Sequence, residues 1–162
     1  MSYPPVRYTG DSGALSATYR PADTPPDLVT ARNRVGYVAT GASTDGELGL
    51  YRWTMEPLSG GAEPHFHRTI SESFFVLSGL VRLYDGRSWV EGSAGDFLHV
   101  PVGGVHAFSN DADAIAEMLI LFTPGAPRES YFEALAEMAA SGRRLTGDEL
   151  VAFLAEHDQY PA

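Results

Sequence analysis

Two histidines and a glutamate lie close together in the middle of the chain. His65 and His67 are separated by one residue, and Glu72 follows after a short polar link. In a β-strand, side chains two positions apart point to the same face, so both imidazoles should project from one strand. Glu72 opens the next apolar run, and a tight connection would return its carboxylate to the imidazoles. Imidazole and carboxylate ligands suit zinc, iron, nickel or copper, and manganese can also use them.

Short apolar segments separated by turn residues surround this cluster. Their even spacing, with Gly, Pro and Asx between them, is typical of an antiparallel sandwich or barrel. Asp85-Gly86 also indicates a tight two-residue hairpin. The predicted strands are residues 34–40, 48–55, 65–67, 72–77, 80–84, 87–90, 97–100, 105–108 and 115–122.

The two ends of the chain differ from this central region. Residues 1–33 are rich in Pro, Gly, Ser and Thr, and we expect an extended arm with little secondary structure. The barrel should span residues 34–123, and residues 124–162 should form a helical cover on one side of it. We therefore expect one globular domain with an N-terminal arm.

Two amphipathic patterns predict the helices of the cover. The first helix should span residues 128–140, with Pro127 at its first position and Gly142 as its stop. The second should begin with a capping box at residues 146–149. Its apolar stripe predicts four buried side chains, Leu150, Val151, Phe153 and Leu154.

Composition narrows the function classes. The chain has 162 residues, is 44% hydrophobic and has no apolar run near the ~18 residues of a membrane span. The net charge of −10, without a basic cluster, argues against nucleic acid or an anionic membrane as a partner. The absence of cysteine and lysine excludes disulfides, thiol catalysis and lysine Schiff bases. The N-terminal segment lacks the apolar core of a signal peptide, so we expect a cytoplasmic location.

A second group of spaced residues lies downstream. It consists of Gly95, Pro101, Gly103, His106 and Asn110. The proline and the second glycine predict a tight corner between two strands. The histidine should then project from the second of those strands.

Together the two groups resemble the two motifs of the cupin superfamily. The second group agrees at every position, and the first departs only at its initial glycine, which is one residue closer to the histidines than usual. The resemblance covers about residues 34–123, and the segment 80–94 between the motifs is close to the shortest that the family uses. The first motif is carried by Gly60, His65, His67, Glu72 and Gly79.

The resemblance implies an all-β core of the jelly-roll type, a double-stranded β-helix, with a metal at its centre. It adds His106 to the set His65, His67 and Glu72 as ligands of one divalent transition metal ion per chain. Fe, Ni, Mn, Zn, Cu and Co are all compatible with three imidazoles and one carboxylate. Such a set leaves a position for water or substrate.

Among cupins, this small single-domain form is most similar to quercetinase-like proteins. That similarity implies a dioxygenase, an oxidoreductase that uses dioxygen on a small hydrophobic or aromatic enol or phenol. Glu72 would remain a ligand or act catalytically by accepting the proton of the substrate. The alternatives are a non-oxidative metal-dependent isomerase or cyclase, and a ligand-binding cupin without turnover. We also expect a homodimer, because barrel edges and the arm need partners.

Strand parity predicts an apolar and aromatic pocket. We expect His99 to be a structural or surface residue outside the site, and His157 to face solvent. Glu63 is expected to be a solvated loop carboxylate within reach of the pocket mouth. The expected pocket residues are Tyr51, Trp53, Phe74, Phe108, Met118 and Ile120.

Overall fold

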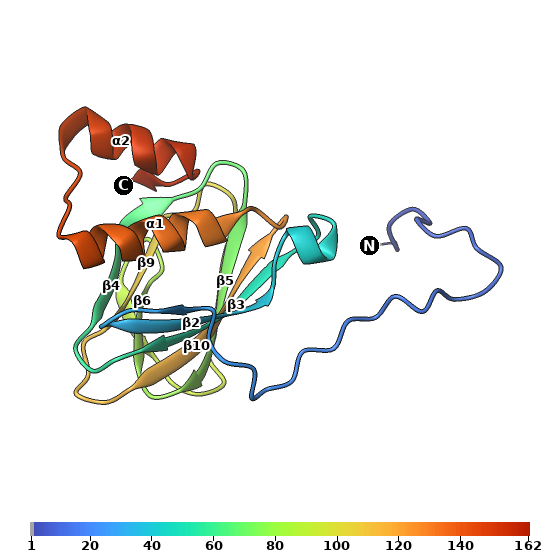
Figure 1. The fold of residues 1–162 in the computed structure, drawn as a ribbon, viewed down its shortest axis with the longest axis horizontal. Helices are drawn as coiled ribbons and strands as arrows, with labels where there is room; N and C mark the ends of the chain where they lie inside the picture. Colours follow the sequence, from blue (N-terminus) through green and yellow to red (C-terminus); the bar gives the residue numbers. More distant parts are fainter. Residues whose placement is uncertain (1) are drawn as a thin grey trace.

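The computed structural model describes residues 2–162. The chain forms many short strands followed by two helices (Figure 1). The strands are β1 (Leu28–Val29), β2 (Asn33–Ala39), β3 (Gly49–Met55), β4 (Gly60–Phe66), β5 (Ser71–Ser78), β6 (Val81–Tyr84), β7 (Trp89–Gly92), β8 (Phe97–Val100), β9 (His106–Asn110), β10 (Ala116–Thr123) and β11 (Tyr160–Pro161). The helices are η1 (Ala42–Thr44), α1 (Arg128–Ser141) and α2 (Gly147–Glu156).

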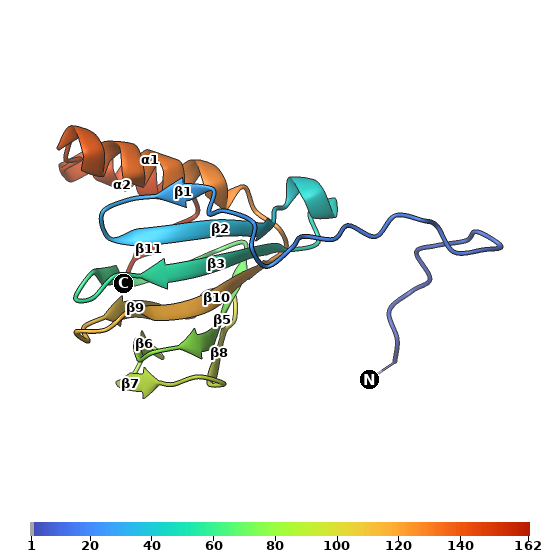
Figure 2. The same ribbon diagram turned by 60° about the horizontal axis from the view of Figure 1, so that its bottom comes forward.

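The strands form two antiparallel sheets that enclose a shared core. One sheet has the order β1-β2-β3-β10-β5-β8, and the other has the order β11-β4-β9-β6-β7. Strands far apart in sequence are neighbours, as β3 is with β10 and β4 is with β9. This arrangement confirms the predicted jelly-roll core, which Figure 2 shows from a second direction.

The alternation of β10 shows how the core is filled. Met118, Ile120 and Phe122 are buried, as the strand period predicts. Glu117 lies on the opposite face, where its Oε1 accepts a hydrogen bond from Nε of Arg52 at 2.8 Å. This alternation fills the interior along β10 with apolar side chains.

Helix α1 packs directly on the strands, whereas α2 lies farther away (Figure 1). The ring of Phe132 in α1 lies 5.2 Å from that of Tyr51 and 5.0 Å from that of Trp53, between ring centroids. Helix α1 thereby closes one side of the barrel, and its inner face becomes part of the core.

The expected burial of the apolar stripe of α2 is wrong, because Phe153 and Leu154 are only partly buried and the other two residues are exposed. Leu150 is 39% exposed and Val151 is 60% exposed. The reason is that α2 packs against α1 through Phe153, whose ring lies 5.7 Å from that of Tyr131, and meets the sheets at the short strand β11, so part of its apolar stripe stays uncovered. An amphipathic stripe predicts that a face is covered, but not how completely.

The helix caps also differ from their prediction. Thr146 is the N-cap of α2, yet its side chain makes no capping hydrogen bond. Arg143 instead donates a hydrogen bond of 2.6 Å to Glu149, the residue expected to complete the capping box. Pro127 is the N-cap of α1 and not its first helical residue, whereas Gly142 ends the helix in the left-handed conformation as expected.

The N-terminal arm extends away from the barrel in both views (Figures 1 and 2). Strand pairing begins at β1, whose Leu28 lies opposite Val35 of β2.

The hairpin between β6 and β7 is present, with Gly86 and Arg87 at its tip, one residue later than predicted. No helix in the described part of the chain has the length and apolarity required to span a membrane.

Candidate metal centre

Four side chains meet inside the barrel. His65 near the end of β4 lies directly opposite His106, the first residue of β9. His67 follows β4, and Glu72 reaches the same point from β5 in the other sheet. One possible ligand atom from each residue lies within 4.8 Å of the others, and all four residues are buried.

Two glycines allow the backbone to bring these residues together. At Gly61 the β4 backbone approaches β9 so closely that a Cβ atom would lie 1.8 Å from the carbonyl oxygen of Phe108. Gly103 has φ of +81°, which favours glycine, and its N–H donates to the carbonyl oxygen of His67 at 2.8 Å. The corner before β9 is thereby tied to the end of β4.

Asn110, the last residue of the second motif, is structural. It is buried at the end of β9, and its side-chain amide donates to the carbonyl oxygens of Glu56 at 3.0 Å and Ala114 at 2.9 Å. Its own oxygen accepts from the N–H of Ala112 at 3.1 Å. These bonds satisfy buried backbone groups and fix the end of the strand that begins with His106.

Backbone carbonyls fix the orientation of all three imidazoles. A carbonyl oxygen only accepts, so each Nδ1 carries the proton, and a neutral ring then has its lone pair on Nε2. The contacts from Nδ1 are His65 to Glu63 at 2.8 Å, His67 to Asp158 at 2.6 Å and His106 to Gly104 at 3.0 Å.

The donor atoms fit a bound cation. Oε2 of Glu72 lies 3.0 Å from Nε2 of His67 and 2.7 Å from Nε2 of His106. A carboxylate oxygen repels the lone pairs of neutral imidazoles at such distances, so the cluster needs protons or a metal ion between these atoms. The nitrogen and oxygen donors suit a divalent first-row metal, and the cluster can hold one such ion.

Burial and mutual charge set the protonation of the cluster. Burial acts to raise the pKa of Glu72, but hydrogen bonds from His106 and His67 outweigh it and lower that pKa. Burial opposes protonation of His106, yet the Glu72 carboxylate raises its pKa. Burial and the charge of His106 lower the pKa of His65 to about 4. At neutral pH, Glu72 is therefore ionised and His65 is neutral, as metal ligation requires.

The cluster borders a cavity of about 510 Å³. His65 and Glu72 line it, and most of the remaining wall is apolar and aromatic. Phe122, Tyr131, Phe132 and Leu154 contribute to this wall, which therefore combines β10 with both helices. A cavity of this size and character suits a small organic molecule.

The predicted pocket residues divide into two groups. Trp53, Phe108 and Ile120 line the cavity. Tyr51, Phe74 and Met118 do not line it, because they are completely buried in the core beneath its wall.

The remaining polar candidates have other roles. His99 is exposed outside the cluster, with its Nδ1 2.9 Å from Oγ of Ser73. Glu63 lies in β4 and not in a loop; it borders the cavity, and its carbonyl oxygen accepts from Nδ1 of His65. The expectation of a solvent-facing His157 is wrong, because its half-buried ring lies 5.2 Å from that of Tyr131.

Sequence reasoning missed two residues near the site. Arg128 is buried and lines the cavity. Asp158 holds the turn after His67, where its carboxylate accepts from N–H of Arg68 at 3.0 Å and N–H of Thr69 at 2.9 Å. No local pattern connects these residues with the ligands, because both arrive from the C-terminal cover.

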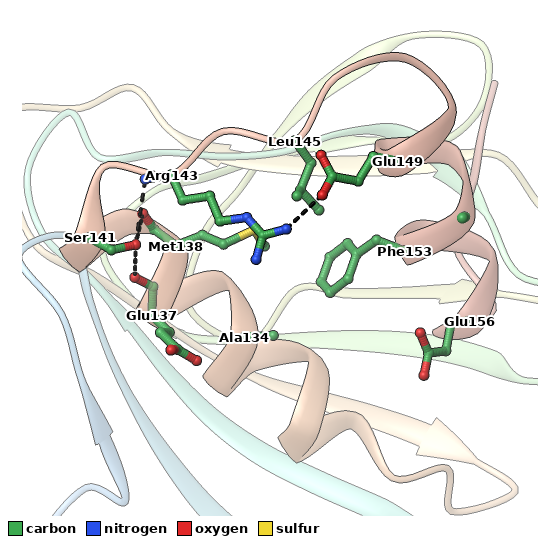
Figure 3. Close-up of a pocket in the computed structure, with 10 residues that line it drawn as sticks. Ala134, Glu137, Met138, Ser141, Arg143, Leu145, Glu149, Phe153 and Glu156 are labelled. Carbon is green, nitrogen blue, oxygen red and sulfur yellow. Dashed lines mark hydrogen bonds and ion pairs between the residues drawn. The ribbon is translucent and has the colours of Figure 1, made fainter.

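A second groove lies between α1 and α2, with a volume of about 360 Å³. Figure 3 shows the ion pair between Arg143 and Glu149 beside the ring of Phe153 in this groove. None of the four clustered residues lines it, so it is separate from the candidate metal centre.

Comparison with known proteins gives matches over the central region of the chain. Residues 51–122 match the family model described as "Cupin domain". The curated quercetin 2,3-dioxygenase of Bacillus subtilis (strain 168) is 28% identical to this chain over 110 residues. The match covers 68% of this chain but only 32% of that enzyme, so it spans less than half of the relative.

Solved structures with the same fold include proteins of different descriptions. KdgF from Halomonas sp. has 16% identity and a TM-score of 0.60, over 70% of this chain and 97% of that one. The polyketide cyclase RemF from Streptomyces resistomycificus has 19% identity and a TM-score of 0.54, over 65% and 78% of the two chains. At these identities the similarity concerns the fold.

Proposed function

We propose that this chain, which contains a cupin domain at residues 51–122, is a metal-dependent dioxygenase that acts on a small, largely apolar enol or phenol. The observation that carries the proposal is the buried cluster of three imidazoles and one carboxylate at the wall of an aromatic cavity. The similarity to quercetin 2,3-dioxygenase supports the oxidative reaction over the other reactions that such a cluster serves.

His65, His67, Glu72 and His106 are the residues that would hold the metal. When bound, a divalent metal supplies a Lewis acid that favours the anion of an enol or phenol and, if redox-active, supports reaction with dioxygen. In the proposed reaction dioxygen is the oxidant and the substrate supplies all four electrons through cleavage of a carbon–carbon bond, so both oxygen atoms enter the products and no external reductant is required.

Glu72 is the proposed acceptor of the substrate proton. The hydrogen bonds that lower its pKa require protons on Nε2 of His67 and His106. When those nitrogens act as ligands they no longer donate, but the charge of the cation would favour the ionised carboxylate, so Glu72 would accept the proton only where it leaves the metal. The aromatic wall, including Phe122 and Phe132, makes the surroundings of this transfer largely apolar.

Oxygen uptake tests this proposal directly. Protein stripped of metal and reloaded separately with Fe²⁺, Ni²⁺, Mn²⁺, Co²⁺, Cu²⁺ or Zn²⁺ would be incubated aerobically and anaerobically with flavonols and β-diketones. We expect oxygen consumption with at least one redox-active metal and none with zinc, which has no redox chemistry. No oxygen uptake with any metal and substrate pair would refute the dioxygenase.

Two variants connect the activity with the cluster. Glu72→Gln keeps the shape of the side chain but removes its basicity, and we expect at least a ~100-fold loss of turnover, the usual contribution of a general base. His99→Ala changes an exposed histidine outside the cluster and should leave turnover unchanged.

The alternative function is a non-oxidative isomerase or cyclase. Conversion of substrate by the zinc-loaded protein under anaerobic conditions would favour it over the dioxygenase.

A further inference from the structure

Three buried side-chain atoms in the described part of the chain have no hydrogen-bond partner. They are Nε of Arg128, Nε1 of Trp53 and Oγ of Ser59. All three residues line the cavity that His65 and Glu72 also line. Buried polar atoms are almost always paired, so three unpaired atoms around one cavity indicate a missing partner. Each of the three atoms can donate, which suggests a partner with acceptor oxygens.

Arg128 is the strongest of these donors. It is only 4% exposed, and its guanidinium makes two hydrogen bonds: to the carbonyl oxygen of His157 at 2.6 Å and to Oε1 of Gln159 at 3.2 Å. A guanidinium has five N–H groups, so most of its donor capacity remains. Rings cover its faces, with its carbon 4.5 Å from the ring centroid of Tyr131 and 5.2 Å from that of Phe122.

The positive charge of Arg128 lacks a direct counterion. None of the ion pairs among residues 2–162 includes it. Burial lowers the pKa of Arg128. The charge of Glu72 acts to raise that pKa, although Glu72 is not among the hydrogen-bond partners of the guanidinium. The carboxylate of Glu72 already contacts Nε2 of His67 and Nε2 of His106. An unpaired buried cation is costly, and an anion that enters the cavity would offset that cost.

We propose that Arg128, with Trp53 and Ser59, forms a subsite for the carboxylate of the substrate. The inference rests on the proposed function and narrows its substrate class to phenolic or enolic carboxylic acids. The carboxylate accepts hydrogen bonds from this subsite, while the phenol or enol oxygen faces His65 and Glu72. The aromatic wall between the two ends packs against the unsaturated carbon skeleton.

Binding measurements on metal-loaded protein test the subsite without requiring turnover. The probes are salicylate, 3-hydroxybenzoate and 4-hydroxybenzoate, each compared with its neutral carboxamide by titration calorimetry. The three isomers place the hydroxyl group at different distances from the carboxylate. One of them can therefore match the separation between the two ends of the cavity. We expect at least one acid to bind about 10- to 100-fold more tightly than its amide, the range for a buried charge-assisted pair.

Variants assign this preference to the proposed donors. In Arg128→Met the ratio of acid to amide affinity should fall to about one, whereas Trp53→Phe and Ser59→Ala should each reduce it by a few-fold. Arg143→Met removes an exposed arginine that does not line this cavity and should keep the wild-type ratio. Metal content and melting temperature of each variant separate an effect on the subsite from an effect on folding.

Equal affinity of the wild-type protein for every acid and its amide would overturn the inference, because water would then suffice as the missing partner. An unchanged ratio in Arg128→Met would overturn it as well. If Arg128→Met does not fold, unchanged ratios in both Trp53→Phe and Ser59→Ala would refute the subsite. A clear preference for acids without oxygen uptake would refute the dioxygenase alone and leave the subsite in place.

Discussion

At the scale of single residues, the candidate metal centre depends on backbone carbonyls as much as on its own side chains. Each Nδ1 is held by a carbonyl oxygen, and in His67 and His106 the Nε2 atom then faces Glu72. The shortest of these contacts, at 2.6 Å, joins His67 to Asp158. Asp158 itself has φ of 53°, a left-handed conformation that its carboxylate stabilises through bonds to Arg68 and Thr69.

Asp158 is therefore predicted to position a metal ligand. Asp158→Ala removes the carboxylate that holds its carbonyl against Nδ1 of His67, and we expect a 10- to 100-fold loss of zinc affinity, the usual effect of such supporting contacts. Competition with a chromogenic chelator would measure it. Asp113→Ala, at an exposed loop position, serves as the control. Equal affinities of Asp158→Ala and the wild type would show that the ring is held without this residue.

The raised pKa of His106 predicts that metal affinity falls as the solution becomes more acidic. Below that pKa a proton occupies the imidazole, and a metal must displace it. We expect the zinc dissociation constant to rise about tenfold or more between pH 8 and pH 6, by competition with one proton. Titration calorimetry in buffers of different ionisation enthalpy would count the released proton. A dissociation constant that is the same at both pH values, with no proton released, would contradict the assignment.

At the scale of elements, the close approach of β4 and β9 brings His65 opposite His106. The Gly61→Ala substitution tests this contact, because the new Cβ would overlap the carbonyl oxygen of Phe108. We expect the free energy of unfolding to fall by about 1–3 kcal/mol, the usual cost of overpacking. Urea denaturation would measure the change. Gly13→Ala, where nothing lies near the new atom, should have no such effect, and equal stability of both variants would contradict the described register.

The sequence predicted the strands of His65, Glu72 and His106 because both motifs are local, but it also placed His67 in a strand, whereas β4 ends at Phe66. The spacing around His65 and the corner before His106 depend on strand period and glycine conformation, which short segments determine. The roles of Arg128 and Asp158 depend on where the C-terminal helices fold back, and no local pattern encodes that path. The same limit explains α2: its stripe was recognised, but the exposure of Val151 depends on packing against α1.

At the scale of the whole molecule, the cluster connects two sheets. His65 and His106 belong to one sheet and Glu72 to the other, so a bound ion would link them. At a metal concentration of 100 times the dissociation constant, binding adds about 2.7 kcal/mol to stability, which for a chain of this length raises the melting temperature by roughly 5–10 °C. Differential scanning calorimetry with zinc and with excess chelator would test this. Equal melting temperatures would show that metal does not bind the folded state. The homodimer stays a prediction from the sequence.

The most direct test of the central claim is the metal content of protein purified without chelator. Elemental analysis should find about one transition metal ion per chain in the wild type, because the four donor atoms define one site. His106→Ala should lose most of that metal, whereas His99→Ala, which changes an exposed histidine of β8 outside the cluster, should retain it. Equal metal content in His106→Ala and the wild type would contradict the site formed by His65, His67, Glu72 and His106.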